Sequence, residues 1–398
     1  MAGIIVLGAI IRIAYFFRPR SFWGDEWFTV FLSQQNFKDV IVSSVKDVHP
    51  PLQFILFHFG GYKLWPFIAG IASLYFFSKL SKDKLATFLF AISPYFIHLS
   101  GETRGYGFLC LFSILALLGY RWAFPCALLS EHYAWFLLIA IPFSLWFIPF
   151  LAASAGLILL QSRAEQVFAS NRGFEWSAQF VIKKIIGLFI QFGGGVQYSF
   201  MTVEQAAMLI KKAYPVFFIA PVIFLFYSKN KRYLKLFLIP LAILLVLYPI
   251  RLNARYLPFC AVSYMILIAT GFRRMNQRKR ILANFIIAAF IIVNLSSLAW
   301  LFKVNYDPYH REDYIGATKY IKENIRPSDG LIGSRAQIRY YLKRDYAEDG
   351  EVIWEVFLGN PDMEINKKLW ALREKELKRK IILSKRFGDL VWVIKYAK

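Results

Sequence analysis

The chain has 398 residues, of which 58% are hydrophobic and 18% are aromatic. With a mean hydropathy of +0.45, it is too apolar for an ordinary soluble globular protein, and the composition predicts an integral membrane protein. Its net charge of +23 would suit a nucleic-acid binder. However, the basic residues lie mostly between apolar runs and in the tail, where they would meet anionic lipid headgroups, and no nucleic-acid-binding module accompanies them, so we predict no nucleic-acid partner.

The chain begins with a short apolar segment. Residues 3–18 are predicted to form a retained anchor helix, because no small-residue cleavage site of a signal peptide follows them. Residues 19–50 mix polar and aromatic side chains, and this composition predicts a loop. Residues 51–65 are apolar but contain His58 and Lys63, so we expect a helix that lies at membrane depth without crossing.

Longer apolar runs predict the membrane-spanning helices. Residues 123–161 are interrupted by prolines and hold either one crossing with a hairpin or three short crossings. The whole chain is therefore expected to cross the membrane about nine to eleven times. The other spans are predicted at residues 66–80, 84–99, 106–121, 213–228, 233–250, 256–272 and 281–301.

Basic residues between these runs predict the orientation of the chain. The basic segments at residues 81–84, 229–232 and 273–280 are expected on the cytoplasmic side. An odd number of crossings must then lie within residues 123–161. The segments expected outside are residues 19–50, 162–212, 250–256 and the tail from residue 303.

The tail differs from the rest of the chain in composition. Residues 303–398 carry 15 of the 25 acidic residues, which predicts a second domain that faces water. Amphipathic helices are predicted at residues 312–325 and 362–379. We therefore expect a membrane domain over residues 1–302 and a small external α/β domain over residues 303–398. Short strands of this α/β domain are predicted at residues 330–333, 352–356 and 391–394.

Two adjacent carboxylates, Asp25 and Glu26, follow the first apolar segment. Charge at a membrane edge is costly and usually marks function. Neighbouring aromatic side chains, such as Trp23 and Trp27, would hold these carboxylates in a partly dry site, where burial raises a carboxyl pKa toward that of a general base. The alternative is structural: the pair caps the next helix or binds a nearby arginine, Arg18 or Arg20.

Other polar residues are predicted at the same membrane face. Arg104 either extends to lipid headgroups or binds a phosphate. The same two alternatives apply to Arg255, which is followed by Tyr256. Glu102 closes a predicted span at this face. His49 precedes two prolines that fix an extended backbone, and it serves either as a structural hydrogen-bonding residue or as a ligand.

The order of these motifs resembles the GT-C membrane glycosyltransferases, and more narrowly their protein O-mannosyltransferase and aminoarabinose transferase branches. The resemblance extends over nearly the whole chain and includes an external tail after the last span. Gly101 and Gly105 stand where bulkier residues are common in that family. The matching positions are Asp25 and Glu26; His49, Pro50 and Pro51; Ser93 and Pro94; Glu102, Thr103, Arg104, Gly105 and Tyr106; and Arg255 and Tyr256.

The resemblance implies an inverting transfer of a sugar from a polyprenyl-phosphate donor to an acceptor hydroxyl of a protein, glycolipid or polysaccharide. Asp25 and Glu26 would be catalytic, with Asp25 as the general base. Arg104, Arg255 and Tyr256 would bind the donor phosphate. The remaining residues, His49, Glu102 and Tyr106, would shape the acceptor site.

The cofactor and location follow from the same resemblance. At most, we expect a divalent cation, Mg²⁺ or Mn²⁺, with Asp25 and Glu102 as its ligands. The protein is expected in the inner or plasma membrane, with its active site and tail toward the periplasm or exterior. The tail shows no comparable cluster of acid, base and nucleophile, so we expect it to shape acceptor access.

Two other classes of protein compete with this interpretation. A transporter or flippase of a lipid-linked or anionic substrate would also place charges at membrane depth, but it predicts internal repeats and midplane charges. No convincing repeat is found, and the acids gather at one boundary. The third class is an inactive scaffold that presents the tail to partners.

Overall fold

The computed structural model describes residues 1–47, 49–170, 178–193, 220–247, 254–304, 312–333, 335–342, 350–358, 364–387 and 391–397. The chain divides into two compact units. The helical unit comprises Met1–Arg18 and Phe28–Leu301, and the C-terminal unit comprises Pro19–Trp27 and Phe302–Lys398.

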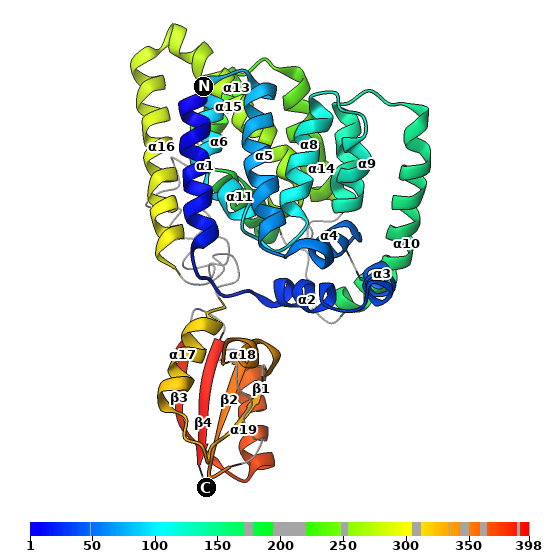
Figure 1. Cartoon of the computed structure of the whole chain (residues 1–398). Helices are drawn as coiled ribbons and strands as arrows, with labels where there is room; N and C mark the ends of the chain where they lie inside the picture. The colour runs from blue at the N-terminus through cyan, green and yellow to red at the C-terminus, as the bar shows by residue number, and fades with distance from the viewer. Residues whose placement is uncertain are drawn as a thin grey trace. The chain divides into compact units, whose positions relative to one another are not determined.

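Helices make up the regular structure of the helical unit in the part of the chain that is described. Figure 1 shows several of them side by side and roughly parallel, while α4 lies across one end. The first helices are α1 (Ala2–Phe17), α2 (Gly24–Ser33, which begins in the C-terminal unit), α3 (Phe37–Lys46), α4 (Leu52–Gly60), α5 (Leu64–Ser81), α6 (Lys84–Ile92), α7 (Pro94–Leu99) and α8 (Tyr106–Leu117). They are followed by α9 (Ala123–Ser130), the 3₁₀ helices η1 (His132–Ile139) and η2 (Leu145–Phe147), α10 (Ile148–Ser170), α11 (Ala178–Phe192), α13 (Ala220–Tyr227), α14 (Lys231–Leu247), the 3₁₀ helix η6 (Ala254–Tyr256), α15 (Pro258–Arg278) and α16 (Arg280–Lys303).

Two of the described helices, α5 and α16, are long and apolar enough to cross a membrane. Shorter apolar helices are α1, α8 and residues Leu145–Leu160. Large apolar side chains such as Ile281 and Phe285 on α16 are exposed in the isolated chain. A lipid environment would cover them, in agreement with the apolar composition.

The basic segments gather at one end of the helical unit. Arg273, near the end of α15, forms an ion pair with Asp83 in the turn between α5 and α6. Ser228, at the end of α13, is 2.8 Å from Thr270 of α15, hydroxyl to hydroxyl. The segments predicted to face the cytoplasm therefore lie together in the fold.

The structure corrects several predicted boundaries. The predicted span at 84–99 is broken into α6 and α7 because Pro94 forces Ser93 into an extended conformation (φ −64°, ψ 118°). The predicted basic loop at 273–280 is mostly helical, and only Lys279 separates α15 from α16. Arg and Lys are good helix formers. A cluster of them therefore indicates which side of the membrane a segment faces, but it does not indicate that the segment is a loop. The predicted loop at 19–50 likewise contains α2 and α3.

The predicted span at 106–121 ends early, at Leu117. Gly119 has a φ of +99°, and the Gly119 and Tyr120 amides donate to Ala116 and Leu115. This pair of hydrogen bonds is the Schellman pattern that closes a helix. Within 123–161 the chain forms α9, η1 and η2, and then starts α10. Residues 213–219 and 248–250 of two predicted spans, and residues 250–253 of the predicted junction, lie outside the described residues.

The C-terminal unit contains a four-stranded mixed sheet in the order β1-β2-β4-β3. Strand β1 pairs in parallel with β2, while β4 is antiparallel to both β2 and β3. The predicted strands and both predicted helices are present, but α18 and β3 were not predicted. Residues 362 and 363 of the second predicted helix lie outside the described residues. The elements are α17 (Tyr314–Asn324), β1 (Gly330–Gly333), α18 (Arg335–Leu342), β2 (Val352–Leu358), α19 (Glu364–Leu377), β3 (Lys380–Phe387) and β4 (Val391–Ala397).

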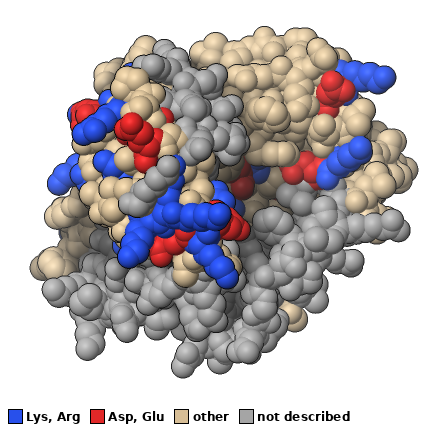
Figure 2. Space-filling view, turned by 90° about the horizontal axis from the view of Figure 1, so that it is seen from below, with Lys and Arg blue, Asp and Glu red and all other residues tan. Residues whose placement is uncertain are grey.

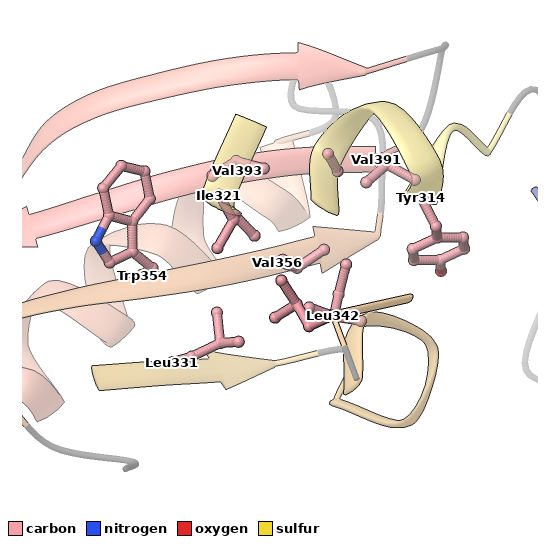
Figure 3. Close-up of a cluster of buried hydrophobic side chains, with 10 residues drawn as sticks. Tyr314, Ile321, Leu331, Leu342, Trp354, Val356, Val391 and Val393 are labelled. Carbon is pink, nitrogen blue, oxygen red and sulfur yellow. The ribbon is translucent and has the colours of Figure 1, made fainter. Parts of the chain in front are cut away.

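The two faces of this sheet bury alternate residues, as the period of a strand requires. On one face Trp354 and Val356 of β2 and Val391 and Val393 of β4 pack beneath α17 and α18, as Figure 3 shows. The other face buries Ile394 and its neighbours near α19.

Figure 2 shows one face of the molecule on which Lys and Arg side chains lie beside Asp and Glu side chains. That face therefore does not carry charge of a single sign.

Candidate functional site

A buried pair, His49 and Glu131, forms the centre of the candidate site in the helical unit. Nδ1 of His49 lies 3.1 Å from Oε2 of Glu131, and the two residues are only 6% and 2% exposed. The other carboxylate oxygen, Oε1, accepts from the His132 amide at 2.9 Å. Glu131 therefore caps η1 and fixes the His49 ring at once. A proton on Nδ1 leaves Nε2 of a neutral His49 as an acceptor.

Two tyrosine rings lie beside His49, and a third tyrosine stacks on one of them. The His49 ring centroid lies 6.2 Å from that of Tyr106 and 6.4 Å from that of Tyr256. Tyr256 in turn lies edge-to-face with Tyr106 at 5.5 Å and stacks on Tyr133 at 5.2 Å. Tyrosine faces of this kind offer apolar area together with a polar rim, which suits a ligand that is part apolar and part hydroxylated.

The side chain of Arg255 lies against the same rings. Its guanidinium is 5.7 Å from the ring centroid of Tyr106 and 5.2 Å from that of Tyr256. Its Nη2 donates to the Tyr256 hydroxyl at 3.4 Å. The backbone of this segment is anchored where the Tyr95 hydroxyl donates to the Ala254 carbonyl at 2.8 Å. The structure thus places the predicted Arg255 and Tyr256 beside the predicted His49 and Tyr106.

Arg104 is buried, with 2% exposure. Its Nη1 donates to the Thr29 hydroxyl at 2.7 Å. Arg104, Arg255 and Glu131 are the formally charged groups that act electrostatically on Tyr106. The Tyr106 hydroxyl is buried and has no hydrogen-bond partner among the described residues. A buried hydroxyl that can donate to a ligand therefore lies within electrostatic reach of two cations and one carboxylate.

Glu102 is held in a second buried group. Its Oε2 lies 3.7 Å from Nε2 of His98, and Nδ1 of the same histidine lies 3.2 Å from the Tyr15 hydroxyl. The Glu102 carbonyl accepts from the Arg104 amide at 2.8 Å. These contacts tie Glu102 to α1 and α7, and its backbone helps to set the position of Arg104.

Two glycines near Arg104, Gly101 and Gly105, are required by close packing. A Cβ atom on Gly105 would lie 2.8 Å from the Ser130 carbonyl oxygen and 3.1 Å from Oε1 of Gln53. A Cβ on Gly101 would lie 2.5 Å from the Tyr15 ring. The departure from bulkier residues at these two positions therefore follows from the close approach of α1 and of the end of α9.

The acidic pair belongs to the C-terminal unit. Glu26 is fully buried and accepts two hydrogen bonds from Arg20, of which the one to Oε2 measures 2.7 Å. The Trp23 amide also donates to Glu26, at 3.3 Å. The pairing with Arg20, one of the two alternatives for the acidic pair, is thus present at Glu26. Asp25 is half-buried, and both acids lie in the first turn of α2, where the helix dipole favours negative charge.

No group of three or more His, Cys, Asp or Glu side chains is placed to hold a metal ion within the described part of the chain. The predicted cation ligands, Asp25 and Glu102, belong to different units. The divalent cation therefore stays a prediction. Both residues are carboxylates, whose oxygens are the ligands that Mg²⁺ and Mn²⁺ prefer.

Sequence reasoning missed Glu131. It is one of the few acids before the tail and lies in an otherwise apolar run. An isolated acid in such a run was the signal that could have identified it.

A cavity of about 300 Å³ lies at the far end of α8 and is lined by residues such as Tyr120, Arg121 and Phe143. The length of α8 separates this cavity from Tyr106 by about 15 Å.

The chain was compared with family models, with curated proteins and with solved structures. No family model matches the chain, and no match is found among curated proteins. Among solved structures, the chain is similar to ArnT from Cupriavidus metallidurans in the apo state, with 11% identity and a TM-score of 0.47. The match covers 99% of this chain and 97% of that chain. The resemblance drawn from the motifs included the aminoarabinose transferase branch.

Proposed function

We propose that the chain is a polytopic membrane glycosyltransferase that moves a sugar from a polyprenyl-phosphate donor to an acceptor hydroxyl. The observation that carries this proposal is the cluster of His49, Glu131, Arg255 and the tyrosine rings around Tyr106. The acceptor belongs to a protein, glycolipid or polysaccharide. The order of motifs in the sequence supports the same reaction.

The cluster matches the two parts of such a donor. Guanidinium groups bind phosphate through a planar fork of donors, and Arg104 and Arg255 supply two of them. Tyrosine faces pack against the apolar face of a sugar ring, while hydroxyls bind its polar edge. The buried Tyr106 hydroxyl can donate to a phosphate or sugar oxygen, since no described residue accepts from it.

The reaction can be written with these residues. The acceptor oxygen attacks the anomeric carbon and forms the new glycosidic bond, while the bond from that carbon to the phosphate oxygen breaks. The polyprenyl phosphate leaves with the electron pair, and Arg104 and Arg255 neutralise its charge. The resemblance in the sequence assigns the proton of the acceptor hydroxyl to Asp25, which would act as the general base. A bound Mg²⁺ or Mn²⁺ would supply further charge neutralisation at the phosphate.

The polarity of the helical unit supports a site on the external side of the inner or plasma membrane. The basic segments around Asp83 and Arg273 gather at one end. Helix α8 begins at Tyr106 and runs away from the candidate site. Positively charged ends of membrane helices face the cytoplasm, so the end with His49 and Tyr106 would face outward.

Two assays on the purified protein and one measurement on a deletion strain test the proposal. In detergent with an acceptor, wild-type protein should release polyprenyl phosphate from a polyprenyl-phosphate sugar, and Arg255→Ala should slow that release at limiting donor. Mass spectrometry of lipid-linked sugars from a deletion strain should show accumulation of the unused donor. In proteoliposomes, movement of the donor between leaflets with no release of polyprenyl phosphate would instead indicate a flippase.

A further inference from the structure

Within the C-terminal unit, the segment with the acidic pair is hydrogen-bonded at three places to residues from the end of the chain. The Gly24 amide donates to Oε2 of Glu312 at 3.0 Å. The Phe22 amide donates to the Tyr341 hydroxyl at 3.0 Å. The Ile315 amide donates to Oγ of Ser21 at 2.9 Å. All these residues belong to the same compact unit, although about 290 to 320 positions separate the partners.

Aromatic packing and burial support these hydrogen bonds. The Trp27 ring lies edge-on to Tyr340 at 4.7 Å and to Tyr341 at 5.7 Å, and edge-on to Phe22 at 5.4 Å. Glu312 is 5% exposed. Burial raises the pKa of Tyr341, which keeps its hydroxyl protonated as a neutral acceptor for the Phe22 amide.

The hydrogen bond from Gly24 has a specific effect on the acidic pair. Gly24 is the first residue of α2, and amides in the first turn of a helix have no partner within the helix. The Glu312 carboxylate accepts from this amide and interacts favourably with the helix dipole. Asp25 is the next residue, so its backbone is fixed by a side chain of the C-terminal unit. Glu26 is fixed separately by Arg20.

We propose that Glu312 and Tyr341 are positioning residues that hold the start of α2, and with it Asp25, in the orientation that proton transfer requires. This inference rests on the proposed function, in which Asp25 is the general base. It assigns the C-terminal unit a part in the chemical step, whereas the sequence predicted a role in acceptor access. Misplacement of a catalytic group by about 1 Å can lower turnover about 100-fold.

Hydrogen exchange and kinetics on the full chain test this role together. Glu312→Ala removes the acceptor, whereas Glu312→Gln keeps an acceptor oxygen. Tyr341→Phe keeps the ring contacts and removes only the hydroxyl. Glu323→Ala is the matched control, because Glu323 lies on α17 with its side chain 59% exposed. The readouts are exchange in peptides covering residues 19–27, kcat, the KM for the donor, and the thermal midpoint as a check of folding.

We expect Glu312→Ala and Tyr341→Phe to raise exchange at residues 22–24 about five- to tenfold, as loss of a hydrogen bond predicts. Their kcat should fall while the KM for the donor stays constant, and Glu312→Gln should recover most of both effects. Unchanged exchange in both variants would overturn the positioning role, whatever the activity. Raised exchange with wild-type kcat would confirm the hydrogen bonds but overturn the positioning role, whereas failure of the proposed function itself would show as wild-type turnover in Asp25→Asn.

Discussion

The Nδ1 atom of His49 lies 3.1 Å from Oε2 of Glu131 and joins segments that are 82 residues apart in the sequence. A buried carboxylate is stable only when it is paired or hydrogen-bonded. Here the two oxygens of Glu131 serve the His49 ring and the His132 amide. The pair thus fixes the segment before α4 to the end of α9, next to the tyrosine rings of the candidate site.

Glu131→Gln should lower turnover about 10- to 100-fold, the equivalent of a charge-assisted hydrogen bond of about 1.5–3 kcal/mol. Glutamine keeps the oxygen that accepts from His132 but removes the negative charge that orients the His49 ring. The measurement is the rate of polyprenyl phosphate release. Asp39→Asn, which changes an exposed acid of α3, is the control and should retain wild-type turnover. Equal turnover in the two variants would indicate that the His49–Glu131 pair has only a structural role.

Arg104→Lys should weaken donor binding about tenfold or more, because lysine keeps the charge but loses the planar fork that binds phosphate at two points. Binding of a non-hydrolysable polyprenyl-phosphate analogue can be measured by calorimetry in detergent. Arg274→Lys, at the exposed basic end of α15, should bind as wild type does. Wild-type affinity in the Arg104 variant would indicate that this arginine does not bind the donor phosphate and has only a structural role, such as its hydrogen bond to Thr29.

Gly105→Ala should destabilise the helical unit by about 1–3 kcal/mol, a typical cost of overpacking. The added Cβ would meet the Ser130 carbonyl oxygen at 2.8 Å, and a backbone atom cannot move as cheaply as a side chain. Gly156→Ala in α10 is the control, since a Cβ there meets nothing within 4 Å and alanine favours a helix. Denaturant unfolding in detergent should separate the two variants; equal stability would contradict the packing described around Gly105.

Asp313 predicts a pH dependence of stability. Burial raises its pKa above the ordinary value of 3.8, and hydrogen bonds from Gly316 and Ser21 oppose that effect. The folded state then binds more protons than the unfolded state between these two pKa values, so stability falls as pH rises through that window. Asp313→Asn keeps the helix cap at Gly316 and removes the titration. Relative to wild type, the variant should gain stability as pH rises from 3.8 to the raised pKa. The free energy of unfolding measured against pH tests this, and parallel curves would contradict it.

Local patterns in the sequence predicted most of the regular structure. Apolar runs located helices such as α5 and α16, and alternating residues located β2 and β4, because burial imposes the period of each element. Pro94 also carried the signal for the break between α6 and α7, since proline excludes the preceding residue from a helix. Strand β3 was missed because its face is mostly exposed and its sequence is basic.

The candidate site was predicted only in part, because its contacts are long-range. The His-Pro-Pro motif and the Arg-Tyr pair indicated His49 and Arg255, but nothing local connects either of them to Glu131. The contact between Glu312 and Gly24 spans 288 positions, and no periodicity can predict such a pair. Residue type indicated which side chains carry chemistry, whereas their partners required the fold.

The central claim is that Asp25 accepts the proton of the acceptor hydroxyl. Glu26 is bound to Arg20 and the Trp23 amide, and the resemblance in the sequence assigns the role of general base to Asp25. Asp25→Asn keeps the size and hydrogen bonding of the side chain but cannot accept a proton at neutral pH.

The most direct measurement is turnover of Asp25→Asn and Glu26→Gln at saturating donor, with donor affinity measured in parallel. We predict that Asp25→Asn lowers turnover about 10²- to 10⁴-fold, the usual contribution of a general base, while donor affinity stays at the wild-type value. Glu26→Gln should act mainly by lowering stability through the lost ion pair, with a milder loss of turnover per folded molecule. Near-normal turnover in folded Asp25→Asn together with an inactive, folded Glu26→Gln would contradict the account.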